Sequence, residues 1–238
     1  MAKADPKTIE PTSVTAPRQL SFDLPAKPAL GRNDFFVSPG NASALATIEN
    51  PGAWPDGKLA LCGPEGSGKT HLTRVWAAQS NAAVLSAGAL VNADIPSLAQ
   101  APVAVEDVPQ IADNSPAQAA LFHLHNLLLA EGQPLLLTGR SAPSHWGLSL
   151  PDLQSRVAAA NLVTLAPPDD ALLAALLAKL FNDRQITPKP DVIPYLVVHM
   201  ERSFQAAATI VSQLDKAAMA QSCAISRPLA ARLIADLG

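Results

Sequence analysis

Between residues 41 and 165, short apolar runs alternate with longer segments in which apolar positions recur every three or four residues. This alternation predicts strands separated by helices, and strands joined through helices run parallel. The apolar runs predict five strands, at 58–62, 82–86, 102–106, 133–138 and 161–165. The helical periods predict helices at 41–49, 69–79, 116–131 and 150–156. We therefore expect an α/β domain with a parallel five-stranded sheet flanked by helices on both faces.

After Pro167 and Pro168 only helical periods remain, at 170–183, 191–199, 203–221 and 228–237. Asp169 or Asp170 is suited to cap the first of these helices, and Ser226 the last, because short polar side chains accept hydrogen bonds from the free amides of a helix N-terminus. The change of pattern predicts a small all-α subdomain. We place the α/β domain at residues 30–166 and the helical subdomain at residues 167–238.

The N-terminal residues lack both periods. Residues 1–17 mix Pro, Thr, Lys and Ala, which is typical of a disordered tail. Residues 18–24, with the sequence RQLSFDL, form a short apolar patch that Pro25 ends, so we expect an exposed linear motif there. We expect neither a signal peptide nor a membrane span, since the leucine-rich run at 171–180 is too short and contains Lys179.

Composition narrows the class of protein. Hydrophobic residues make up 48% of the chain and charged residues 16%, as in a globular, helix-rich protein. The net charge is −3 and the basic residues are scattered, which argues against direct sequence-specific DNA binding. Cys62 and Cys223 lie far apart, and Cys62 falls in an apolar run, so we expect free thiols and a cytoplasmic protein.

The segment after the first predicted strand fits the phosphate-loop pattern G-x-x-x-x-G-K-[ST] and opens a predicted helix. In such a loop, backbone amides converge on phosphate oxygens, the lysine reaches the β- and γ-phosphates, and the last hydroxyl ligates Mg²⁺. The expected ligand is ADP or ATP with Mg²⁺. We include the following residue, His71, among the nucleotide contacts and not as a catalytic base. The loop consists of Gly63, Pro64, Glu65, Gly66, Ser67, Gly68, Lys69 and Thr70.

Polar residues end two further predicted strands. A magnesium ion at the phosphate loop needs acidic oxygens, which we expect at the end of a neighbouring strand, and Glu106 and Asp107 with Thr70 are the predicted ligands. The alternative is a pair of surface acids at a strand end. The fourth predicted strand ends at Thr138, with Arg140 two residues later.

With these elements in order, four further stretches complete a family resemblance. They are DFFVSPGN at 34–41, FHLHNLLLAEG at 122–132, LLLTGRSAP at 135–143 and LPDLQSRV at 150–157. From residue 19 to residue 237 the chain resembles the DnaA-related branch of the P-loop AAA+ family, and in particular its Hda-like regulators of DnaA. The resemblance implies an AAA+ nucleotide-binding domain followed by an α-helical lid.

The resemblance also implies roles for single residues. Arg156 matches the arginine finger, which a subunit offers to the nucleotide of another molecule, although it would also suit a structural role at a helix end. Arg202 matches the lid arginine called sensor 2, and Thr138 matches sensor 1, with Arg140 as the alternative. Phe36 and Val37 match the adenine contact.

Two features bear on activity and partners. AAA+ proteins usually carry Asp before Glu where this chain has Glu106 before Asp107, an inversion that predicts weak or no ATP hydrolysis by the chain itself. The linear motif resembles the peptide by which bacterial replication proteins bind the β sliding clamp of DNA polymerase III. Its predicted clamp contacts are Gln19, Leu20, Ser21, Phe22 and Leu24.

Together these features imply a negative regulator of replication initiation. The chain would bind an adenine nucleotide, dock on the clamp and so associate with the replisome, and stimulate ATP hydrolysis by DnaA through Arg156. The residues end soon after the lid, so we expect none of the helix-turn-helix DNA reader of DnaA. Two alternatives stay open: an autonomous ATPase or loader of the DnaA branch, and an adaptor that only tethers. The sequence does not decide whether the chain forms a homodimer.

Overall fold

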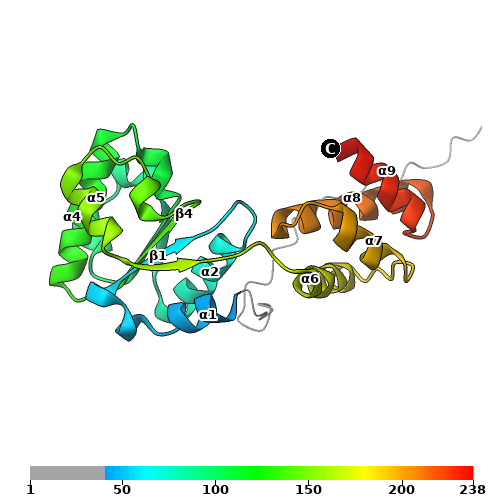
Figure 1. Cartoon of the computed structure of the whole chain (residues 1–238), viewed down its shortest axis with the longest axis horizontal. Helices are drawn as coiled ribbons and strands as arrows, with labels where there is room; N and C mark the ends of the chain where they lie inside the picture. The colour runs from blue at the N-terminus through cyan, green and yellow to red at the C-terminus, as the bar shows by residue number, and fades with distance from the viewer. Residues whose placement is uncertain (1–40, 238) are drawn as a thin grey trace, which may run out of the picture.

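The computed structural model describes residues 41–237, which form an α/β lobe and a helical lobe (Figure 1). The predictions for residues 1–17, for the motif at 18–24, and for Phe36 and Val37 lie outside this range. The α/β lobe contains α1 (Ala42–Ile48), η2 (Pro51–Ala53), η3 (Pro55–Gly57), β1 (Lys58–Cys62), α2 (Lys69–Ser80), β2 (Ala83–Ser86), η4 (Ala87–Asn92), α3 (Ile95–Leu98), β3 (Val103–Glu106), η5 (Val108–Ile111), α4 (Ser115–Ala130), β4 (Leu135–Gly139), η6 (Pro143–His145), α5 (Pro151–Ala158) and β5 (Asn161–Thr164). The helical lobe contains α6 (Asp170–Asp183), α7 (Val192–His199), α8 (Phe204–Gln221) and α9 (Arg227–Leu237).

The five strands form one sheet in the order β2-β3-β4-β1-β5, and every neighbouring pair is parallel. Successive residues of a strand point to opposite faces, and β1 shows the consequence. Ala60 and Cys62 join the apolar core beneath α4 and α5, whereas Leu59 and Leu61 join the core beneath α1 and α2. The fold class predicted from the apolar pattern is thus confirmed, with helices on both faces of the sheet.

Differences from the predicted elements occur at prolines and in short turns. The third and fourth strands begin one and two residues later than predicted, after Pro102 and Pro134. Proline has no N–H to donate to a strand ladder, so these residues contribute only their carbonyl oxygens, to Ala83 N and Val103 N. Residues 87–98, which lack a helical period, form the short helices η4 and α3 that the sequence did not predict.

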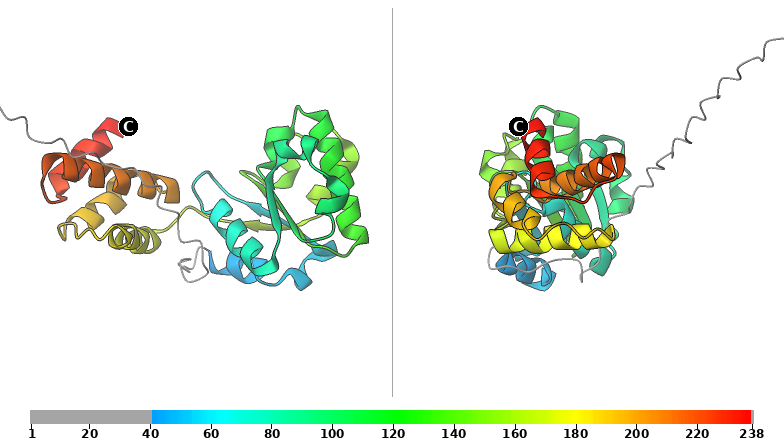
Figure 2. Two further views of the ribbon diagram at one scale, coloured as in Figure 1. Left: turned by 180° about the vertical axis from the view of Figure 1, so that it is seen from behind. Right: turned by 90° about the vertical axis from the view of Figure 1, so that its right-hand side faces the viewer.

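The helical lobe has an apolar core of its own, built from α6 to α9 around Leu177, Phe181 and Leu214. Asp169 caps α6, as predicted, by accepting a hydrogen bond of 2.7 Å from the Leu172 amide. The lobe joins the sheet through the segment after β5, and the carboxyl ends of the strands point toward it (Figures 1 and 2). Within residues 41–237, no helix is long and apolar enough to cross a bilayer.

Gln118 on α4 holds together the two segments that position the polar end of β3 and the start of α5. The side chain is 1% exposed. Its Nε2 donates to the Ile111 and Ala112 carbonyl oxygens at 2.9 and 2.6 Å, and its Oε1 accepts from the Ser149 and Leu150 amides at 3.0 Å each. Both ends of the amide are therefore satisfied in a buried position.

Replacement of Gln118 by alanine should lower the free energy of unfolding by about 2–4 kcal/mol, because it leaves buried backbone donors and acceptors without partners. The exposed Gln110 on η5 supplies the control, and Gln110→Ala should change the stability by less than about 0.5 kcal/mol. Urea denaturation of both variants measures the difference. Equal stabilities would show that the Gln118 network contributes nothing.

Candidate nucleotide-binding site

The candidate site lies where the carboxyl ends of β1, β3 and β4 meet. Cys62 pairs with Gly139 and Val105 with Leu137, so the residues that follow these strands lie on one edge of the sheet. Neighbouring strands are about 4.8 Å apart, and β4 lies between β1 and β3. The expectation that the acidic residues end a strand adjacent to β1 is therefore wrong: Glu106 and Gly63 are separated by a gap of about 10 Å, two strand spacings.

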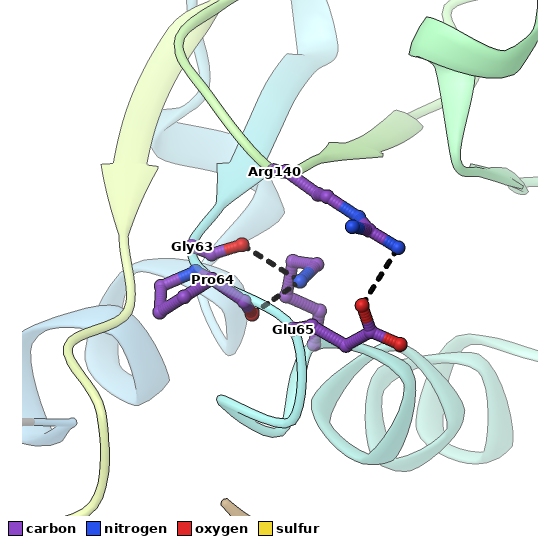
Figure 3. Close-up of polar contacts among 5 residues, drawn as sticks. Gly63, Pro64, Glu65 and Arg140 are labelled. Carbon is purple, nitrogen blue, oxygen red and sulfur yellow. Dashed lines mark hydrogen bonds and ion pairs between the residues drawn. The ribbon is translucent and has the colours of Figure 1, made fainter. Parts of the chain in front are cut away.

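The phosphate loop connects β1 to α2 through glycines in conformations that other residues rarely adopt. Gly66 has a φ of 70° and Gly68 a φ of 96°. Lys69, the first residue of α2, is 9% exposed, and its Nζ donates to the carbonyl oxygens of Gly63 and Pro64 at 2.8 Å each (Figure 3). Burial lowers the pKa of Lys69, while the carboxylate of Asp107 acts in the opposite direction. The ammonium group is thus held inside the loop that the sequence assigned to phosphate.

An ion pair links the phosphate loop to the residue after β4. Arg140 approaches Glu65 at 2.8 Å, and Figure 3 shows the two side chains meeting above the loop. Both side chains are exposed, so water screens the attraction and the pair contributes little stability. Such a weakly held guanidinium is free to exchange its carboxylate partner for another anion.

The acidic residues lie at the end of β3, on the far side of β4 from β1, and Thr138 lies in β4 itself. Asp107 has a left-handed backbone, with a φ of 57°, and its amide donates to the buried Thr138 Oγ1 at 3.0 Å. Glu106 keeps one buried carboxylate oxygen, Oε1, that has no hydrogen-bond partner within residues 41–237. An acceptor-only oxygen in this position calls for a cation or a donor.

These groups fit a magnesium–nucleotide complex. Mg²⁺ takes one or two carboxylates together with phosphate oxygens and water, so a cluster of three acidic or histidine ligands is not required, and the described residues contain none. Glu106 and Asp107 supply carboxylates, Thr70 on the first turn of α2 supplies an exposed hydroxyl, and half-buried His71 follows it. Ser67 Oγ is a further buried polar atom of the loop without a partner in the described chain.

The start of α8 contacts the phosphate loop directly. The Phe204 amide donates to the Gly66 carbonyl oxygen at 2.9 Å. A Cβ at Gly66 would collide with Ser203, and a Cβ at Gly68 would lie 3.3 Å from the Phe204 ring. The glycines therefore serve two purposes, since they allow the loop conformation and also make room for the helical lobe.

Arg202 immediately precedes this contact. Its guanidinium forms an ion pair with Asp170 on the first turn of α6, and both side chains are half exposed. Arg202 thus lies on the helical lobe next to the residues that touch the loop, and its role as sensor 2 stays a prediction. The sequence did not predict the roles of Asp170 and Phe204 or the Glu65–Arg140 pair, because the partners lie 32 to 138 residues apart and no local pattern marks them.

Arg156 lies elsewhere. It is exposed on α5, where its guanidinium carbon sits 5.4 Å from the centroid of the Phe122 ring. Arg156 lines a pocket together with Lys58, the first residue of β1, whereas the phosphate loop follows the last residue of that strand. Five strand residues span about 16 Å, so Arg156 is at the opposite edge of the sheet from its own phosphate loop.

No protein-family model matches the chain. Among solved structures, domain III of the Thermotoga maritima replication initiation protein DnaA has a TM-score of 0.74 at 18% identity, over 90% of this chain and 98% of that one. A replication initiator DnaA bound to AMPPCP and single-stranded DNA has a TM-score of 0.66 at 19% identity, over 82% of this chain and 68% of that one.

A DNA replication initiation factor has a TM-score of 0.69 at 19% identity, over 79% of this chain. The chain spans only 64% of the length of that protein. Identities this low establish a shared fold and nothing finer. The chain therefore has the AAA+ fold. Its match to DnaA domain III extends over almost the whole of both chains.

The contact between the phosphate loop and α8 can be tested with two glycines of similar backbone. Gly66→Ala and Gly132→Ala both place alanine at a positive φ, at a cost of about 1–2 kcal/mol each. Only Gly66→Ala also collides with Ser203, since a Cβ at Gly132 meets nothing within 4 Å. Amide hydrogen exchange at Phe204 should accelerate by about tenfold or more in Gly66→Ala alone. Equal acceleration in both variants would contradict the contact.

Proposed function

We propose that this chain is a DnaA-related AAA+ protein that binds an adenine nucleotide with Mg²⁺ and uses Arg156 to promote ATP hydrolysis by DnaA, in a complex formed on the sliding clamp. The observation that carries the proposal is the division of the α/β lobe. One edge of the sheet holds the phosphate loop, and the opposite edge presents an exposed arginine. A guanidinium in that position serves another molecule's nucleotide and not its own.

The carboxyl edge supports nucleotide binding. Lys69 would exchange the Gly63 and Pro64 carbonyl oxygens for phosphate oxygens, which are stronger acceptors for an ammonium group. Glu106, Asp107 and Thr70 would hold Mg²⁺, and the structural likeness to a DnaA that binds AMPPCP supports an adenine nucleotide. Phe36 and Val37, before the described residues, are the proposed adenine contacts.

Nucleotide binding would also reach the helical lobe. Arg202 is adjacent to the residues that touch Gly66, and its present partner Asp170 is an exposed carboxylate. A phosphate group competes well for such a guanidinium because charge-assisted bonds to phosphate are strong and bidentate. We therefore assign Arg202 the role of coupling the nucleotide to the lid. Thr138, whose Oγ1 accepts a hydrogen bond from the Asp107 amide, would position the acids.

The amino edge supports action on a partner. In the transition state of phosphoryl transfer, negative charge spreads over the equatorial oxygens of the γ-phosphate, and an arginine from a second molecule stabilises it. Arg156 makes no ion pair with any residue in 41–237 and rests on the Phe122 ring, so its donors face outward. Because the chain is similar in structure to DnaA, we propose that the partner is DnaA. The peptide at 18–24 is the proposed clamp contact.

One observation favours a second candidate, an autonomous ATPase of the DnaA branch. The unpartnered Glu106 Oε1 at the end of β3 could orient a water molecule as well as a metal ion. Brisk ATP turnover by the isolated chain, abolished by Glu106→Gln, would favour that candidate over the regulator.

Lys69→Ala should weaken binding of ADP and of ATP by about tenfold to a hundredfold, the value of a charge-assisted contact of about 1.5–3 kcal/mol. Calorimetry with each nucleotide and Mg²⁺ measures the loss. Lys189→Ala, which removes an exposed lysine of the helical lobe, should leave the affinity unchanged. If the parent chain and Lys69→Ala bind equally, the phosphate loop is not the nucleotide site.

Arg156→Ala and Arg156→Lys should both abolish stimulation of phosphate release from ATP-bound DnaA in the presence of clamp loaded on DNA. Arginine fingers contribute about 10³–10⁵ in rate, and lysine lacks the planar fork that produces it. The exposed Arg232 on α9 provides the control, since Arg232→Ala should stimulate like the parent.

Gln19→Ala should separate docking from catalysis in the same assay, because it removes the clamp contact and keeps Arg156. If the chain only tethers, Arg156→Ala should leave the stimulation unchanged. If Arg156→Ala stimulates as well as the parent while Gln19→Ala does not, the chain only tethers.

A further inference from the structure

The amino edge of the sheet contains a pocket of about 370 Å³ that the nucleotide site does not use. Lys58 at the start of β1, His125 on α4 and Arg156 on α5 all line it. These residues are 67 and 31 positions apart in sequence order, and only the packing of α4 and α5 against the sheet unites them. Three nitrogen-bearing side chains in one cavity call for an acceptor.

Lys58 is a buried cation with few partners. It is 2% exposed, and its Nζ makes one hydrogen bond within the described chain, to the Gln133 carbonyl oxygen at 3.2 Å. An ammonium group has three hydrogens, so two remain to be satisfied. Burial lowers the pKa of Lys58 to about 8, and the carboxylate of Asp56 only partly offsets this effect. The charged form is thus retained at neutral pH without a compensating ion pair.

His125 contributes an unpartnered polar atom. The side chain is 4% exposed, and its Nδ1 is buried without a hydrogen-bond partner in residues 41–237. Burial, and then the positive charges of Lys58 and Arg156, lower the pKa of His125 to about 4. The ring is therefore neutral at pH 7, and the tautomer with its proton on Nδ1 would offer that N–H to an acceptor in the pocket.

Acidic residues reach only the outer part of the pocket. Asp56 and Asp152 also line it, and both are exposed, so water and salt screen their charges. Neither forms an ion pair with Lys58 or Arg156. Lys58 and His125 are buried, whereas the two acids and Arg156 are exposed at the rim, so the deep part of the pocket is electropositive.

We propose that this pocket is a binding site for a phosphate group, with Lys58 and Arg156 as its cations and His125 as a neutral N–H donor. The Ser155 hydroxyl, on the α5 turn that bears Arg156, is the further donor in reach of the pocket. Phosphate offers several acceptor oxygens in tetrahedral array, which matches donors that converge from a strand and two helices. The phosphate could be free in solution or the end of a polyphosphate chain.

Occupancy of the pocket would have a regulatory consequence, which rests on the proposed function. Arg156 stands at the rim, so a phosphate bound beneath it would draw the guanidinium inward and away from a partner's nucleotide. Free phosphate, a product of the proposed reaction, would then inhibit the stimulation.

The test is a histidine NMR titration of the full chain from about pH 5 to about pH 8, with and without inorganic phosphate, at matched ionic strength in sodium chloride. A bound anion beside His125 should raise its pKa by about 1–3 units, which brings its ionisation into the observed range. The response should saturate with phosphate. His123, exposed on the same helix, should show no comparable change.

Two variants identify the donors. Lys58→Met keeps the length of the side chain and removes the charge, and Arg156→Ala alters only an exposed position and so preserves folding. Each should reduce or abolish the saturable change at His125. The proposal is overturned if inorganic phosphate and tripolyphosphate both leave His125 unmoved, if chloride moves it equally, or if the response persists in both variants.

Tripolyphosphate distinguishes the two sources. A response to inorganic phosphate supports a site for the free ion, whereas a response to tripolyphosphate alone supports the end of a polyphosphate chain. The readout involves neither DnaA nor the clamp. Loss of stimulation in the assay for Arg156 and loss of phosphate binding here are therefore separate results, and either can fail alone.

Discussion

Parallel pairing of β1 with both β4 and β5 is the constraint on which the rest of the structure depends. In a parallel sheet all carboxyl ends lie on one edge and all amino ends on the other, and the connecting helices must cover both faces. The phosphate loop, the acids after β3 and the polar residues after β4 consequently share the carboxyl edge. The same rule sends the end of α5, which returns to start β5, to the amino edge together with Arg156.

Two buried lysines, one at each edge of the sheet, differ in the number of hydrogen-bond acceptors around their ammonium groups. Lys69 lies in a loop whose carbonyl oxygens accept two hydrogen bonds from it, so its ammonium is held in place and ready to exchange those weak acceptors for phosphate. Lys58 lies at the other end of β1. It has one carbonyl acceptor, and the His125 ring that lines the same pocket is neutral. Burial without pairing is costly, which is why the second lysine marks a pocket that an anion would stabilise.

The contact between Gly66 and the start of α8 links the carboxyl edge to the helical lobe. Because a loop that closes around phosphate must shift its carbonyl groups, any such shift changes the hydrogen bond to Phe204. The exposed pairs Arg202–Asp170 and Glu65–Arg140 surround the same loop and are weak enough to rearrange with it. Within residues 41–237 the apolar cores of the two lobes are separate, so we expect these few polar contacts to couple the site to the orientation of the helical lobe.

The sequence by itself determined the five strands, the longer helices and the position of the phosphate loop. These features are local in the sequence. Strand-length apolar runs, helical periods and the cap at Asp169 each depend on residues within one or two turns, and a glycine that adopts a positive φ affects only the residues next to it. Only the tertiary structure decided that β4 separates β1 from β3, that Phe204 lies on Gly66, and that Lys58, His125 and Arg156 share a pocket. Strand order and the packing of α4, α5 and α8 depend on contacts between residues tens of positions apart, and no local pattern in the chain encodes which of many compatible partners will meet.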